Sequence, residues 1–165
     1  MSLSLAQGFD WLARPDAQVL ILGSIPGIAS LQQQQYYAHP RNAFWPIMQQ
    51  IYDWPHLDYA RRCQALINEK IALWDVLHSC RRRGSLDSDI DSNSLAINNF
   101  PALLSRHPDI SRILFNGAKA AQLFQRHVNI PDAIQLVKLP STSPAHAAMS
   151  FQVKLEKWRM ALISE

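Results

Sequence analysis

Four short runs of apolar residues recur along the chain, each bounded by polar residues, glycine or proline. They cover residues 18–22, 70–74, 110–115 and 133–138. Their apolar positions are mostly consecutive rather than alternating, which is typical of strands that are covered on both faces of a sheet. We therefore predict four buried strands at these positions.

Between these runs, apolar residues recur at helical spacing. From Phe44 to Ile51 they follow positions i, i+3, i+4 and i+7, and similar patterns occur within residues 59–67, 118–124 and 151–162. An alternation of strands and helices predicts an α/β fold with parallel strands. We expect a three-layer α/β/α sandwich with a mostly parallel four-stranded central sheet.

Composition bounds the size and class of the protein. The chain has 165 residues, of which 48% are hydrophobic and 18% charged, so we expect one domain over residues 1–165 with an ample core. Lysine and arginine number 16 against 13 acidic residues, and the resulting net charge of +3 permits a nucleic-acid partner without requiring one.

Several classes of protein are disfavoured. Two cysteines are too few for a disulfide scaffold or a four-cysteine metal site, and no His, Asp or Glu cluster has metal-ligand spacing. We expect no metal and no cofactor. No apolar run approaches the length of a membrane helix and the N-terminus lacks the basic region of a secretory signal, so we expect a cytoplasmic protein without membrane contact.

Ligands of parallel sheets bind beyond the carboxyl ends of the strands. This rule selects the segments 23–42, 75–91, 116–117 and 139–146. The first begins with Gly23–Gly27, a turn that allows a ligand close to the backbone. It has neither the glycine spacing of a dinucleotide-binding turn nor the lysine of a phosphate-binding loop.

The stretch from Tyr36 to Trp45 concentrates polar chemistry in a segment that Pro40 keeps out of a helix. Asn42 stands where a helix N-cap is expected, and capping alone accounts for it. Tyr37 suits either the core or stacking on a base. His39 either contacts a phosphate or base, or holds the loop through hydrogen bonds.

Arg81–Arg83 follow the second predicted strand and precede Asp87, Asp89 and Asp91. At the ligand edge, these arginines either contact phosphates or pair with the aspartates. Asp75, just before them, either anchors the same loop or caps a helix.

Taken together, residues 23–27, 36–45 and 139–145 resemble the signature of the uracil-DNA glycosylase superfamily, in particular its hypoxanthine-DNA glycosylase branch. The resemblance implies a monomeric, monofunctional enzyme of base excision repair. Such an enzyme flips a deaminated base, chiefly hypoxanthine, out of double-stranded DNA and hydrolyses its N-glycosidic bond. A uracil- or mismatch-specific glycosylase and an inactive DNA-binding relative remain the alternatives.

The resemblance also assigns roles to residues of this sequence. It places the catalytic role on Asn42, because Ile25 stands where many members have a water-activating Asn or Asp. Since the signature segments contain no acidic residue and no lysine, we expect hydrolysis led by an asparagine and without a Schiff base. Ala145 is small where relatives insert a larger wedge. The expected base-binding residues are Gly23, Ser24, Ile25, Pro26, Gly27, Tyr37, His39, Phe44 and Asn116, and the expected DNA contacts are Arg81, Arg82, Arg83, Ser141, Thr142, Ser143, Ala145 and His146.

Overall fold

The computed structural model describes residues 3–163 and has a parallel sheet at its centre. The strand order is β3-β2-β6-β7, and each predicted strand is present one or two residues later than expected. The expectation that all four are buried is wrong for β7, which lies at the edge of the sheet and is mostly exposed. The strands are β2 (Val19–Gly23), β3 (Ile71–Asp75), β6 (Arg112–Asn116) and β7 (Gln135–Leu139). Every residue of β2 and β3 is buried, which accounts for their uninterrupted apolar sequence.

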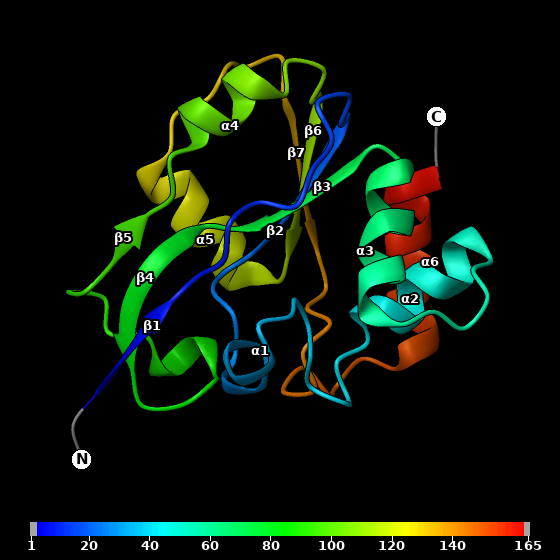
Figure 1. Ribbon diagram of the computed structural model, residues 1–165. Helices are drawn as coiled ribbons and strands as arrows, with labels where there is room; N and C mark the ends of the chain where they lie inside the picture. The colour runs from blue at the N-terminus through cyan, green and yellow to red at the C-terminus, as the bar shows by residue number, and fades with distance from the viewer. Residues whose placement is uncertain (1–2, 164–165) are drawn as a thin grey trace.

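Helices cover both faces of this sheet, so the three-layer fold is confirmed (Figure 1). Leu20 and Leu22 of β2 belong to one core, and Val19 and Ile21 to the other, because successive side chains of a strand point to opposite faces. The first core is completed by α4 (Phe100–Arg106) and α5 (Ala118–His127), and the second by α2 (Phe44–Tyr52), α3 (Tyr59–Asn68) and α6 (Phe151–Ile163). The short helix α1 (Ile28–Gln33) follows β2 at the carboxyl edge.

A second, antiparallel sheet was not predicted. It has the order β1-β4-β5 and consists of β1 (Ser4–Gln7), β4 (Leu77–Arg82) and β5 (Ala96–Ile97). Only Val76 separates β3 from β4, so the two strands form one long bent ribbon in Figure 1. The expectation of a loop directly after the second predicted strand is therefore wrong over residues 77–82. The strand β4 was not predicted because its sequence is largely polar. It is half exposed and pairs with β1.

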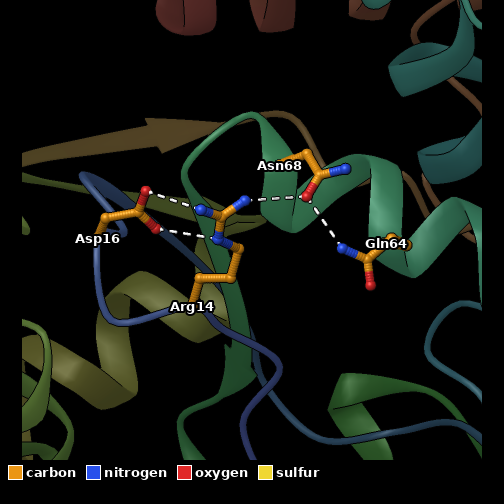
Figure 2. A network of polar contacts seen from close by, with 4 residues as sticks. All are labelled: Arg14, Asp16, Gln64 and Asn68. Carbon is orange, nitrogen blue, oxygen red and sulfur yellow. Dashed lines mark hydrogen bonds and ion pairs between the residues drawn. The ribbon is translucent and has the colours of Figure 1, made fainter.

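Polar side chains join the two segments that enter the sheet at its amino edge (Figure 2). Arg14, before β2, donates from Nη1 to Asn68 Oδ1 at 3.1 Å, and its Nε lies 3.3 Å from Asp16 Oδ1. Gln64 Nε2 donates to the same Asn68 oxygen at 2.9 Å. The side chains of Arg14 and Asp16 are 46% and 41% exposed, so water screens this network.

Among residues 3–163, no helix is both long enough and apolar enough to cross a membrane.

Candidate active site

A cavity of about 730 Å³ opens at the carboxyl edge of the parallel sheet. Its walls come from the turn after β2, the segment before α2 and the segments that follow β4, β6 and β7. The structure thus brings together segments that lie far apart in the sequence. Nine residues expected to act on the base or sugar line it, namely Gly23, Ser24, Ile25, Pro26, Gly27, Tyr37, His39, Asn42 and Asn116.

Phe44 does not line the cavity, so the expected contact between Phe44 and the base is wrong. Its side chain is fully buried at the start of α2, where it belongs to the core. The ring of Tyr37 stacks on it, with centroids 4.2 Å apart and an interplanar angle of 26°. Phe44 therefore supports Tyr37, which itself has a left-handed backbone with φ of 54°.

A carboxyl group outside the three signature segments also faces the cavity. Asp75 ends β3, is only 3% exposed, and its Oδ2 atom has no hydrogen-bond partner within residues 3–163. Burial first, and then the negative charge of Asp87, raise the pKa of Asp75 to about 7, against an opposing effect of Arg82. A carboxyl of this kind is able to take either protonation state near neutral pH.

Gly23 lets Asp75 and Tyr37 approach the turn after β2. A Cβ atom on Gly23 would lie 2.6 Å from Asp75 Oδ1 and 3.1 Å from the Tyr37 hydroxyl, so only glycine fits between them. The Tyr37 hydroxyl is buried and, within the described chain, has no hydrogen-bond partner. Burial first, and then the Asp75 charge, raise the pKa of Tyr37 against an opposing effect of Asn116, so its phenol keeps its proton and is a hydrogen-bond donor.

Asn42 has one end of its amide fixed by the backbone. Its Oδ1 accepts the Phe44 N–H at 3.0 Å, which is the expected capping interaction, although Ala43 and not Asn42 occupies the cap position of α2. A backbone N–H requires an acceptor, so this bond assigns the oxygen and nitrogen of the amide. The Nδ2 amino group remains as the donor that Asn42 offers to the cavity.

Hydrogen bonds of Asn116 and Thr142, here called the clamp, connect the end of β6 to the segment after β7 and to the segment that carries Asn42. Asn116 Nδ2 donates to Thr142 Oγ1, and Asn116 Oδ1 accepts the Thr142 N–H, both at 2.9 Å. The Thr142 carbonyl in turn accepts the Ala43 N–H at 2.9 Å. Since both Asn116 and Thr142 are buried, this clamp fixes the position of Asn42 relative to the sheet. Thr142 is only 1% exposed and its hydroxyl is used by the clamp, so the expected contact between Thr142 and DNA is wrong.

Serine hydroxyls fix the backbone of the segment after β7, residues 141–145. Ser141 Oγ accepts the Ser143 N–H at 3.1 Å, and Ser143 Oγ accepts the Ala145 N–H at 3.2 Å. Gly117, with φ of 99°, lets the end of β6 lie against Ser141, because a Cβ there would be 3.1 Å from the Ser141 Cβ. His146 also lines the cavity, and its Nε2 atom is buried without a partner in the described chain.

Arg82 is an expected DNA contact that the structure contradicts. It is only 4% exposed, and its guanidinium donates to the Pro26 carbonyl, so it supports the turn after β2 from inside. Alternate residues of a strand face opposite sides, which puts Arg81 on the outer side of β4. Arg81 and Arg83 are exposed, and neither lines the cavity.

The aspartates after the arginines hold their own loop instead. Asp87 accepts the Ser24 hydroxyl, and Asp89 Oδ2 accepts the Leu86 N–H at 3.2 Å. Asp91 Oδ1 accepts the Asn93 N–H at 3.1 Å. Within residues 3–163, none of them forms a direct ion pair with these arginines, although the charges of Asp87 and Asp89 oppose the lowering of the Arg82 pKa by burial.

Three charged residues of the cavity wall were missed as parts of the site, namely Asp75, Asp87 and Lys119. Asp75 ends a predicted strand, so the strand-end rule alone was a signal for it. Lys119 lies at the start of α5, two residues after Gly117, and it lines the wall although it is outside the three signature segments. In the described residues, no three His, Cys, Asp or Glu side chains gather as a metal site would require.

Comparisons with known proteins place this site in a family. Residues 9–162 match the uracil DNA glycosylase superfamily. A protein of Methanosarcina barkeri named hypoxanthine DNA glycosylase is 38% identical over 118 residues, which are 70% of this chain and 73% of that protein. A protein of the same name from Methanosarcina acetivorans is 34% identical over 123 residues, which are 72% of this chain and 75% of that protein.

A solved structure agrees with these matches. The solution NMR structure of a Methanosarcina acetivorans protein, described as a candidate uracil DNA glycosylase, has a TM-score of 0.80 and 30% identity to this chain. The likeness covers 96% of this chain and 97% of that one. On sequence and structure alike, the chain belongs to the uracil DNA glycosylase superfamily.

Proposed function

We propose that this protein is a monofunctional DNA glycosylase that flips deaminated bases, chiefly hypoxanthine, out of double-stranded DNA and hydrolyses the N-glycosidic bond. The observation that carries the proposal is the pair of buried, unpartnered polar groups on Asp75 and Tyr37 beside the cavity. The names of the two Methanosarcina relatives support the choice of base. The proposal includes a single domain over residues 1–165 that acts as a cytoplasmic monomer.

The Asp75–Tyr37 pair suits the edge that deamination creates on a base. Hypoxanthine presents a ring N1–H donor beside the C6 carbonyl acceptor, whereas adenine presents the reverse order of acceptor and donor. Enzymes that flip bases read this edge by hydrogen bonds. Protonated Asp75 accepts the N1–H and donates to the carbonyl, and the Tyr37 hydroxyl is a second donor; ionised Asp75 accepts only.

Asn42 acts on the departing base in this proposal. When the bond between C1′ and the base nitrogen breaks, its electron pair leaves with the base, and the oxygen of a water molecule bonds to C1′. Because Oδ1 of Asn42 already accepts the Phe44 N–H, its Nδ2 donates to the base and stabilises the negative charge. The attacking water then loses a proton, and protonation of the departed base anion balances this loss, so the products are an abasic site and neutral hypoxanthine.

The rim of the cavity has cations that suit a DNA backbone. Arg41 is exposed and Lys119 is partly exposed, and both line the cavity. Each Lys or Arg that neutralises a phosphate releases counterions, so DNA affinity falls as the salt concentration rises. Arg41→Ala and Lys119→Ala should each flatten this dependence by about one counterion, whereas Arg106→Ala, exposed at the end of α4 and outside the cavity wall, serves as the control.

The direct test uses duplexes with a single inosine, uracil, xanthine or adenine at one position. After incubation with the protein, alkali cleaves any abasic sites, and the strands are separated by size. Breaks at inosine first are the expected result, with none at adenine. Breaks at uracil alone would replace hypoxanthine by uracil as the substrate, and binding without breaks would overturn the proposal. Borohydride trapping should leave no covalent complex, since Lys119 is not expected to form a Schiff base.

A further inference from the structure

An apolar side chain stands at the rim of the cavity, on the loop between β4 and the short 3₁₀ helix of residues 87–89. Leu86 is 48% exposed and lines the cavity. Ile28, at the start of α1, is 45% exposed and also lines the cavity. The loop and α1 are joined, because the Ile28 N–H donates to Ser85 Oγ at 2.8 Å. One side of the cavity mouth is therefore apolar and faces solvent.

The loop that carries Leu86 is held on both sides. The Leu86 N–H donates to Asp89 Oδ2 at 3.2 Å, and the Leu86 carbonyl accepts the Asp89 N–H at 2.9 Å. The next residue, Asp87, accepts the Ser24 hydroxyl. Both the backbone at Leu86 and the turn after β2 are thus fixed, while the leucine side chain remains exposed.

In the segment after β7, the side chains that line the cavity are either half-buried, as in Pro144, or small. Ala145 is exposed and lines the cavity, but its single methyl group cannot fill the space of a base. A single exposed leucine is common on protein surfaces and by itself indicates little. Here the exposed leucine is anchored at the mouth of a cavity that also has unpartnered buried polar groups.

Extrusion of a nucleotide leaves a gap in the base stack, and proteins that open such gaps insert Leu, Ile, Phe, Met or Pro side chains. We propose that Leu86 is the side chain that enters the DNA base stack when the target nucleotide is extruded, with Ile28 beside it. This inference rests on the proposed glycosylase function. It places the wedge on the loop after β4 and leaves the serine-held segment after β7 to contact the strand.

Excision from two forms of DNA tests this assignment. The rate constant for inosine excision is measured under single-turnover conditions on a duplex and on the same strand alone, for wild type, Leu86→Ala and Leu136→Ala. Leu136 is an exposed leucine on β7, 38% exposed, and serves as the matched control. Only duplex DNA requires unstacking against a partner strand, so we expect Leu86→Ala to lose at least about tenfold on the duplex and less than about twofold on the single strand.

A bulky replacement sharpens the result. Leu86→Met should recover most of the duplex rate, since methionine is also found as a wedge. A duplex rate of Leu86→Ala equal to that of wild type, or an equal loss on both forms of DNA, would overturn the inference while the glycosylase function stands. If wild type excises inosine from neither form, the proposed function fails and the inference fails with it.

Discussion

Polar side chains at the two edges of the parallel sheet differ in burial and in hydrogen bonding. At the amino edge, Arg14 and Asn68 are exposed and hydrogen-bonded, and the half-exposed Asp16 is ion-paired with Arg14, whose Nε lies 3.3 Å from the otherwise unbonded Oδ1 of Asp16 (Figure 2). At the carboxyl edge, Asp75 Oδ2 and the Tyr37 hydroxyl are buried and have no partner among residues 3–163. An exposed ion pair contributes about 0.2–1 kcal/mol to stability, whereas a buried polar group without a partner costs about 1–3 kcal/mol. The fold tolerates this cost at the edge where a ligand is able to supply the missing hydrogen bonds.

The largest effect is expected from Asn42, at the carboxyl edge. Asn42→Ala should lower the rate of hypoxanthine excision by about 10²–10³, the usual loss for one preorganised donor to a developing charge. Asn42→Asp keeps an acceptor for the Phe44 N–H but loses the amino group. Single-turnover kinetics should therefore show Asn42→Asp to be as slow as Asn42→Ala. An Asn42→Asp variant that keeps wild-type activity would instead mean that an acceptor activates water.

The next effect concerns stability and its dependence on pH. The folded protein holds the Asp75 proton up to a pKa of about 7, while the unfolded chain releases it near pH 4. Stability due to this group is therefore complete below about pH 4, falls as the pH rises to about 7, and is constant above.

Asp75→Asn removes this loss, so the variant should be more stable than wild type by roughly 2–4 kcal/mol at pH 8, and the difference should shrink toward pH 4. Thermal unfolding at several pH values measures it, and Asp132→Asn in an exposed loop is the control. A difference that does not vary with pH would contradict the raised pKa.

A smaller effect is expected from Thr142, a residue at the carboxyl edge whose hydrogen bonds are satisfied within the protein. Thr142→Val removes the hydroxyl that accepts from Asn116 Nδ2 and leaves this buried donor unpaired. We expect a loss of about 1–3 kcal/mol in the free energy of unfolding, with slower excision because the clamp also holds Ala43. Thr142→Ser, which keeps the hydroxyl, should lose clearly less. If denaturant unfolding gives the same free energy of unfolding for Thr142→Ser and Thr142→Val, the hydrogen bond to the Thr142 hydroxyl does not stabilise the fold.

The smallest effect is expected at the amino edge. Arg14→Ala breaks the network of Figure 2 and should cost less than about 1 kcal/mol. Excision should stay within about twofold of wild type, because the network lies at the other end of the strands. A large loss of activity in this variant would mean that the two edges of the sheet are coupled.

Most of the parallel sheet was predictable because burial on both faces leaves consecutive apolar residues, as in β2 and β3. The strand β4 was not, since its sequence from Leu77 to Arg82 mixes buried and exposed positions and depends on pairing with β1. Arg82 shows the consequence. An arginine in a polar run is typical of a solvated surface, yet here it is buried under the turn after β2.

The candidate site was predictable where it is local. Two segments line the cavity, the turn after β2 and the segment with Tyr37 and Asn42. Each of them is one continuous stretch of sequence. Asp75, Asp87 and Lys119 come from three other elements and meet these segments only through the strand order. The raised pKa of Asp75 follows from burial and from the nearby charge of Asp87. Neither the burial nor this proximity can be predicted from the residues next to Asp75 in the sequence.

In the proposed function, the buried carboxyl of Asp75 forms hydrogen bonds to the edge of the deaminated base. The single-turnover rate of hypoxanthine excision from pH 5.5 to 8.5 for wild type, Asp75→Asn and Asp75→Leu tests this role. The ratio of wild type to Asp75→Asn should fall as the pH rises through about 7, because ionised Asp75 loses its donor while asparagine keeps one, and Asp75→Leu should be slow throughout. An Asp75→Asn variant as slow as Asp75→Leu, or a ratio that does not change with pH, would contradict the account.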